Sequence, residues 1–198
     1  MKKLVVGITA PQSVDLLNGQ LRYFSEKGYD VYLLAPGTEQ VINFCRDENA
    51  TLLAIDIERN ISPLKDLKTL FSIIRIFKKH KPDIVNLGTP KVSLLGMIAA
   101  KLTGVPLRIY TCRGYRFEHE KGKMRSFLIS LEKITSKFAT KIICISKSVR
   151  DLGVKEGIFT EEKTTLIGRG SSNGLNLRLF NPETVSEGTI EEYKEKYG

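Results

Sequence analysis

The stretch that decides the fold runs from Lys81 to Phe117 and reads KPDIVNLGTPKVSLLGMIAAKLTGVPLRIYTCRGYRF. Residues 84–87 form an apolar run of strand length, and residues 92–102 have the small and apolar composition of a buried helix. A glycine and a proline then end this helix before a second apolar run begins. Strand–helix–strand units bind ligands at the carboxyl ends of their strands, so the loops at 88–91 and 113–117 are predicted to share one functional rim.

Strand and helix patterns alternate along the rest of the chain as well. Runs of strand length occur at 4–9, 31–34, 51–57, 142–145 and 164–167, and long helical stripes occur at 64–81 and 124–138. This order predicts an α/β fold, a doubly wound, mostly parallel sheet with helices on both faces. We expect one Rossmann-like domain over residues 1–180 and a polar tail over residues 181–198.

The composition is that of one sizeable globular domain, with 198 residues, 41% hydrophobic and 27% charged. No apolar run reaches the length of a membrane span, and the first apolar run is too short for a secretory signal. The three cysteines are widely spaced, so we expect buried free thiols in a reducing cytosol. The two histidines are isolated, and no protein metal site is expected.

The net charge of +9 is concentrated in two segments. Residues 65–81 and 113–141 each carry a local charge of +5, which favours an anionic partner. In the second segment, a helix with apolar residues on one side is flanked by cations. An ordinary solvated face and a face on anionic lipid are equally consistent with this pattern. The candidate membrane-facing residues are Lys121, Lys123, Arg125, Phe127, Lys133 and Lys137.

The first strand lacks the signature of dinucleotide binding. The turn after it, from Gly7 to Gln12, contains no Gly-x-Gly-x-x-Gly, and Pro11 removes a backbone amide that a phosphate would need. The second strand ends at Ala35-Pro36 without an acidic residue for a ribose hydroxyl. A hydride-transfer enzyme is therefore disfavoured.

A set of short motifs resembles the N-terminal domain of family 4 glycosyltransferases, which have the two-domain GT-B fold. The resemblance is strongest to the bacterial branch that builds capsular and O-antigen polysaccharide. The motifs cover most of the chain in order, and they are Arg59–Asp66, Lys81–Asn86, Thr89–Lys91 with Leu95-Gly96, Gly104–Pro106, Tyr110–Gly114, Ile143–Ser148, Lys163–Gly174 and Phe180–Pro182.

The resemblance implies that this domain holds the acceptor and that an absent C-terminal domain binds the nucleotide sugar. The expected acceptor is a saccharide or a polyprenyl-diphosphate-linked saccharide, and the expected donor of the full enzyme is a UDP-sugar. No cofactor is expected on this domain, and the chain alone is expected to be inactive. The resemblance places the protein in the cytoplasm, and a lipid-linked acceptor would place it at the inner face of the membrane.

Rim position and the resemblance together give the candidate substrate-binding residues. They are Pro11, Gln12, Ser13, Gly19, Thr89, Lys91, Arg113, Gly114, Tyr115, Arg169, Gly170, Ser171, Ser172 and Asn173. Arg113 stands where many family members have a histidine, so no catalytic residue is assigned. Two alternatives stay open, because Thr89 is equally well explained as a helix cap and residues 168–174 as a linker between domains.

A second hypothesis is a non-catalytic basic module that binds anionic lipid or nucleic acid. Nucleic-acid binding is disfavoured, because the aromatic residues of the basic helices follow core spacing instead of forming an exposed stacking surface.

Overall fold

The computed structural model describes residues 1–58, 60–171, 174, 180–181, 183 and 185–197. The strands are β1 (Lys3–Gly7), β2 (Asp30–Ala35), β3 (Thr51–Ala54), β4 (Ile84–Leu87), β5 (Leu107–Cys112), β6 (Lys141–Cys144) and β7 (Thr164–Leu166). The α-helices are α1 (Gln20–Glu26), α2 (Glu39–Asp47), α3 (Pro63–His80), α4 (Pro90–Leu102), α5 (Gly122–Phe138), α6 (Lys147–Lys155) and α7 (Glu187–Tyr197). Short 3-10 helices are η1 (Pro11–Leu17), η2 (Arg116–His119) and η3 (Glu161–Lys163).

The seven strands form one sheet in the order β3-β2-β1-β4-β5-β6-β7, and every neighbouring pair is parallel. β1 lies between β2 and β4, with Gly7 opposite both Leu34 and Leu87. The chain reverses its direction of winding at β1 and β4, and such a switch point opens a crevice at the carboxyl ends of the strands. The predicted doubly wound parallel sheet is confirmed.

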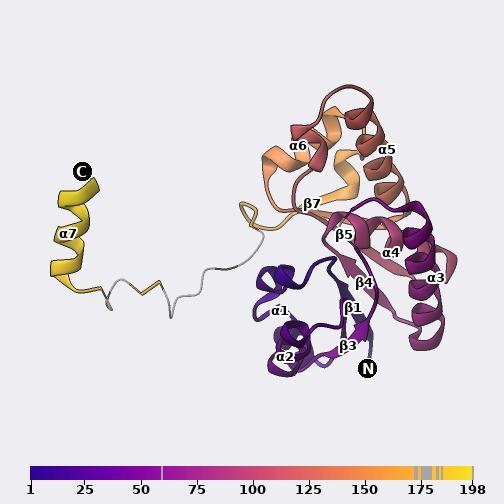
Figure 1. Ribbon diagram of the computed structural model, residues 1–198, viewed down its shortest axis with the longest axis horizontal. Coiled ribbons are helices and arrows are strands. Elements are labelled where there is room, and N and C mark those ends of the chain that lie inside the picture. The colour runs from indigo at the N-terminus through magenta and orange to yellow at the C-terminus, as the bar shows by residue number, and fades with distance from the viewer. Residues whose placement is uncertain (59, 172–173, 175–179, 182, 184, 198) are drawn as a thin grey trace.

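The two faces of the sheet carry separate apolar cores, because side chains alternate along each strand. On β1, Leu4 and Val6 pack in the core beneath α1 and α2, and Val5 packs in the core beneath α3, α4 and α5. Figure 1 shows these two groups of helices on opposite sides of the sheet. All three cysteines are buried and free, as expected.

Some predicted boundaries and faces differ from the structure. β1 ends at Gly7 and β3 at Ala54, so the residues that follow each strand belong to its rim loop. The predicted tail contains α7, a helix with no buried residue. Because α7 has few apolar residues, its sequence contains no apolar stripe from which a helix could be predicted.

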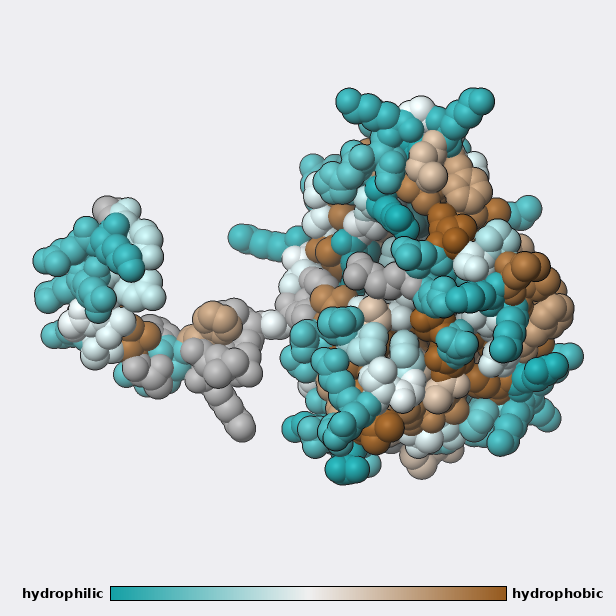
Figure 2. Space-filling model, viewed as in Figure 1, coloured by the Kyte–Doolittle hydropathy of each residue, from teal (hydrophilic) through white to brown (hydrophobic). Residues whose placement is uncertain are grey.

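The apolar stripe of α3 is only partly buried. Ile73 and Phe77 pack in the core, whereas Leu64 is 85% exposed and Phe71 is 53% exposed. The apolar stripe predicted for this helix is therefore buried only in part. Figure 2 shows apolar surface on the side of the molecule where Figure 1 places α3. No helix among the described residues is long and apolar enough to cross a membrane.

Candidate functional site

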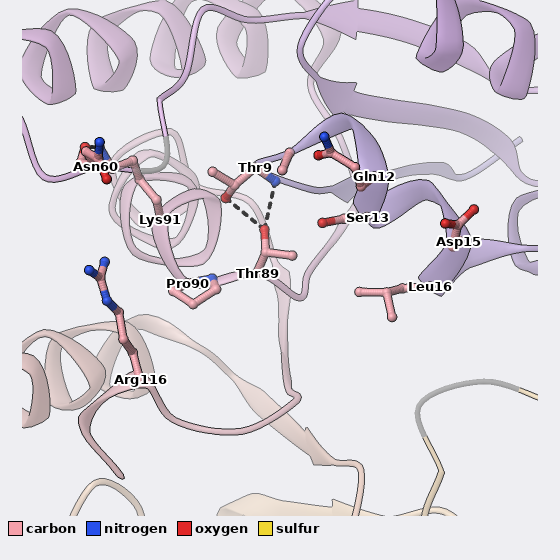
Figure 3. Close-up of a pocket in the computed structure, with 11 residues that line it drawn as sticks. Thr9, Gln12, Ser13, Asp15, Leu16, Asn60, Thr89, Pro90, Lys91 and Arg116 are labelled. Atoms are coloured by element: carbon pink, nitrogen blue, oxygen red, sulfur yellow. Dashed lines mark hydrogen bonds between the residues drawn. The ribbon is translucent and has the colours of Figure 1, made fainter. Parts of the chain in front are cut away.

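A central hollow of about 840 Å³ lies at the carboxyl ends of β1 and β4. Its lining comes from the loop after β1, from η1, from the loop before α3, from the start of α4 and from η2. The lining residues are Thr9, Ala10, Gln12, Ser13, Asp15, Leu16, Asn60, Thr89, Pro90, Lys91 and Arg116. Figure 3 shows Asn60 and Arg116 at one end of this hollow and Asp15 and Leu16 at the other. The predicted rim thus encloses a shared concavity.

Two threonines join the halves of the sheet at the floor of the hollow. The Thr9 amide donates to Thr89 Oγ1 at 2.8 Å, and the two hydroxyls lie 2.8 Å apart (Figure 3). Thr89 occupies the N-cap position of α4, as predicted, but its side chain caps no amide of that helix. Thr9 Oγ1 takes this role instead, because it accepts the Val92 N–H at 3.1 Å.

Close packing at Gly7 lets α4 approach β1 closely enough for these bonds. A Cβ on Gly7 would lie 2.5 Å from Leu87 Cδ2 and 3.2 Å from Val92 Cγ2. A larger residue would therefore push the start of α4 away from the sheet. Thr9 and Thr89 are buried, so they fix the floor while other side chains present the accessible groups.

Two of the predicted binding residues on η1 do line the hollow. Gln12 is exposed and Ser13 is half-buried, and both offer hydrogen-bonding groups there. Pro11 begins η1 and does not line the hollow itself. The Ser13 amide donates to the Ala10 carbonyl at 2.9 Å, which closes the turn that leads into η1.

Lys91 lines the hollow, but its charge is already neutralised. Its Nζ lies 2.6 Å from Asp66 Oδ1 and also donates to the Asn60 carbonyl oxygen. Its side chain is only 9% exposed. The ammonium therefore ties the start of α4 to the segment before α3, and the prediction that it binds substrate has no support from its contacts.

Arg116 is the exposed cation that lines this hollow among the described residues. It begins η2, lines the hollow, and forms no ion pair with any residue that the structure describes. Guanidinium groups bind phosphate and carboxylate through paired N–H donors. The hollow thus offers a polar side at η1, which includes the acidic side chain of Asp15, and a cationic side at η2.

Arg113, Gly114 and Tyr115 lie beside the hollow and do not line it. Arg113 is packed against Gly88, where a Cβ would lie 3.0 Å from the Arg113 Nε, and burial lowers the pKa of its guanidinium. Tyr115 is buried, and its hydroxyl donates to the Val149 carbonyl at 2.9 Å. The structure therefore gives Tyr115 a packing role, where we had predicted substrate contact.

The loop after β7 contains Arg169, Gly170 and Ser171, none of which lines the central hollow. Gly170 has a φ of +89°, and a Cβ there would lie 2.5 Å from the Ile145 carbonyl oxygen. The glycine is needed for close packing on the loop after β6. Ser172 and Asn173 lie outside the described residues.

Gly19 serves the start of α1 and lies away from the hollow. It has a φ of +75°, and its amide donates to Glu48 Oε1 at 3.0 Å. The glycine at this position is therefore explained by the turn that begins α1, and not by contact with the hollow.

Five of the six candidate membrane-facing residues on and before α5 are exposed, and Arg125 is the exception. Its guanidinium forms a 2.6 Å ion pair with Glu156 and lies over the Phe117 ring. It therefore holds α5 against its neighbours. Among the described residues, no group of His, Cys, Asp or Glu side chains is arranged to hold a metal ion.

Several residues that line the hollow are not among the candidates predicted from the sequence, and they include Thr9, Asp15, Leu16, Asn60 and Arg116. For Thr9 the available signal was its position directly after a strand at the switch point. Asn60 has no such position directly after a strand. It lies at the hollow because Lys91, far away in the sequence, donates a hydrogen bond to its carbonyl oxygen.

Comparison with known proteins finds a family that the sequence of this chain matches. Residues 10–146 match the family described as "Glycosyl transferase 4-like". The chain is 38% identical over 173 residues to the capsular polysaccharide biosynthesis glycosyltransferase CapM of Staphylococcus aureus, covering 87% of this chain and 45% of that protein.

An Escherichia coli relative and a solved structure extend the comparison. The relative is UDP-Gal:alpha-D-GlcNAc-diphosphoundecaprenol alpha-1,3-galactosyltransferase, 31% identical over 165 residues, which are 83% of this chain and 41% of that protein. The structure of a glycosyltransferase from Rickettsia africae ESF-5 superposes with a TM-score of 0.69 at 19% identity, over 99% of this chain and 49% of that one. The chain thus spans about half the length of the proteins it matches. The alternative of a non-catalytic binding module is not favoured.

Proposed function

This chain belongs to the glycosyltransferase 4-like family, and we propose that it is the acceptor-binding half of an enzyme that transfers a sugar from a nucleotide sugar to a lipid-diphosphate-linked saccharide. The synthesis of a bacterial surface polysaccharide is the process we propose for it, because CapM carries that role in its name.

The central hollow carries this proposal. It lies at the switch point of the sheet and combines Gln12, Ser13 and Arg116 around the buried Thr9–Thr89 pair. Amide and hydroxyl groups suit the hydroxyls of a saccharide, and an exposed guanidinium suits a diphosphate. The acceptor in the name of the E. coli relative has both parts, a sugar and a diphosphate.

We assign residues 1–180 to the acceptor domain and residues 181–198 to the start of the connection to a donor domain. The donor, a UDP-sugar as in the name of the E. coli relative, would bind that second domain. Closure of two lobes excludes water and aligns the reacting groups, so this chain alone is expected to show almost no transfer.

We further propose that α5 lies on an anionic membrane surface on the cytoplasmic side. The exposed side chains of Lys121, Lys123, Phe127, Lys133 and Lys137 support this, since cations around an exposed aromatic ring suit an interfacial helix.

Binding measurements with the purified chain test the acceptor assignment. The probe is the methyl ester of N-acetylglucosamine diphosphate, measured by calorimetry, with a UDP-sugar as the comparison ligand. We expect the chain to bind the acceptor analogue and not the UDP-sugar.

A matched pair of arginine variants then locates the site. Arg116→Ala is expected to weaken acceptor binding about tenfold or more, because a hydrogen bond to a charged group contributes roughly 1.5–3 kcal/mol. Arg46→Ala on α2 removes an exposed arginine that does not line the hollow and should have no effect. Equal loss in both variants, or binding of the UDP-sugar alone, contradicts the assignment.

A further inference from the structure

An apolar slot lies beside the central hollow, between α4 and α5. Its volume is about 190 Å³. Its walls are built from Leu94, Leu95, Phe117, Phe127, Leu128 and Leu131. An engineered cavity of roughly 150 Å³ with a similar aliphatic and aromatic lining stays dry and binds benzene. The slot is therefore large enough for a short branched hydrocarbon segment.

Apart from Arg116, the charged side chains that line the slot have hydrogen-bonding partners. Lys91 is bonded to Asp66 at 2.6 Å, and Glu132 accepts the Tyr110 hydroxyl at 2.7 Å. Both pairs satisfy groups that would otherwise demand water or a polar ligand. The remaining lining favours a hydrocarbon occupant.

The slot and the central hollow adjoin each other, because Pro90, Lys91 and Arg116 line both. Arg116 therefore lies at the junction of a polar hollow and an apolar slot. A ligand with an anionic group at this guanidinium can place a polar part in the hollow and an apolar part in the slot. A sugar diphosphate ester of an isoprenoid alcohol has this order of parts.

We propose that the apolar slot holds the isoprenoid carbons next to the diphosphate of a polyprenyl-diphosphate-linked acceptor, an inference that rests on the proposed function. The slot has room for only the first units, and the remaining chain leaves past Phe127, whose side chain is 45% exposed. The occupant is the acceptor's own lipid and not a bilayer acyl chain, because Arg116 lines both the slot and the proposed site of the acceptor head.

The test compares two esters of N-acetylglucosamine diphosphate, methyl and geranyl, bound to the purified chain without vesicles. We expect the geranyl ester to bind at least about tenfold more tightly, because burial of even a few methylene groups has that effect. Equal affinity for the two esters overturns the slot assignment and leaves the proposed function standing. No binding of either ester refutes both.

Two variants separate the slot from other apolar surfaces. Phe127→Ser removes one exposed wall, and Leu94→Trp fills the interior, so each should abolish the geranyl advantage without changing methyl-ester affinity. Met124→Ser is the matched control, because Met124 is 48% exposed on the same helix and does not line the slot. The advantage should survive in this control.

Two results from these variants would overturn the inference. The first is a geranyl advantage that persists in both slot variants, which would assign it to another surface. The second is a loss confined to vesicle binding, with ester affinities unchanged, which would make the slot a bilayer contact.

Discussion

Replacement of Thr9 by valine tests how the floor of the central hollow is held. Valine has nearly the shape of threonine, and it removes only the hydroxyl that accepts the Val92 N–H at 3.1 Å and meets the Thr89 hydroxyl at 2.8 Å. Thr9 is 7% exposed, so water has little access to replace the lost acceptor. A buried amide without a partner costs about 1–3 kcal/mol, and loss of a helix cap costs about the same. The unpaired amide and the lost cap are the same Val92 N–H, so the two costs are not added. We expect Thr9→Val to lower the free energy of unfolding by about 2 kcal/mol.

Urea unfolding at 25 °C measures this loss, and the m-value should stay unchanged. The melting temperature should fall by roughly 4–8 °C for a chain of this size. Thr135→Val is the matched control, because Thr135 is also buried but its hydroxyl only donates to the Leu131 carbonyl of its own helix at 3.0 Å. That control should lose less than about 0.5 kcal/mol, since the carbonyl keeps its helical partner. If Thr9→Val costs no more than Thr135→Val, the cross-sheet cap does not hold α4.

Three more outcomes are expected. Burial raises the pKa of Glu132 from 4.5 to about 7, so the folded chain retains a proton that the unfolded chain releases, and the free energy of unfolding should fall by up to about 3 kcal/mol as pH rises from 4.5 through 7. Urea titrations at several pH values should show this slope, and Glu132→Gln should remove it; an unchanged slope in the variant would rule out this group. Gly170→Ala should lower the melting temperature measurably, because its φ of +89° and the Ile145 carbonyl 2.5 Å from the new Cβ together cost roughly 1–3 kcal/mol; a variant as stable as the parent would refute this packing role. Reversal of charge at Lys133 and Lys137 should weaken sedimentation with anionic vesicles and leave the melting temperature nearly unchanged, and undiminished sedimentation would count against membrane contact through α5.

Much of the fold was predictable because periodicity is a local property. Strand-length apolar runs separated by helical stripes specify a parallel sheet with helical crossovers, and the structure confirms it. The faces of the helices were less predictable. The buried positions Thr69, Ile73 and Phe77 recur every four residues on one side of α3, whereas the exposed Leu64 and Phe71 lie on another side of the same helix.

The candidate site was predicted as a rim but not as a set of side chains. Arg113 and Arg116 are three residues apart in one loop, and no pattern in the sequence separates their roles. The glycine between them has a φ of +131°, and the chain then enters η2. One guanidinium therefore packs against Gly88, and the other lines the hollow.

By itself the sequence determined the layered parallel sheet, the rim on which its ligand-binding loops lie, and the family resemblance. Each of these depends on spacing between neighbours along the chain. Only the tertiary structure decided which cation is available, since Lys91 is neutralised by Asp66, 25 residues away, and Arg116 is not. It also decided that an apolar slot adjoins the hollow. The physical reason is that ion pairs and cavities depend on side chains brought together from distant segments. No local pattern in the sequence specifies those contacts.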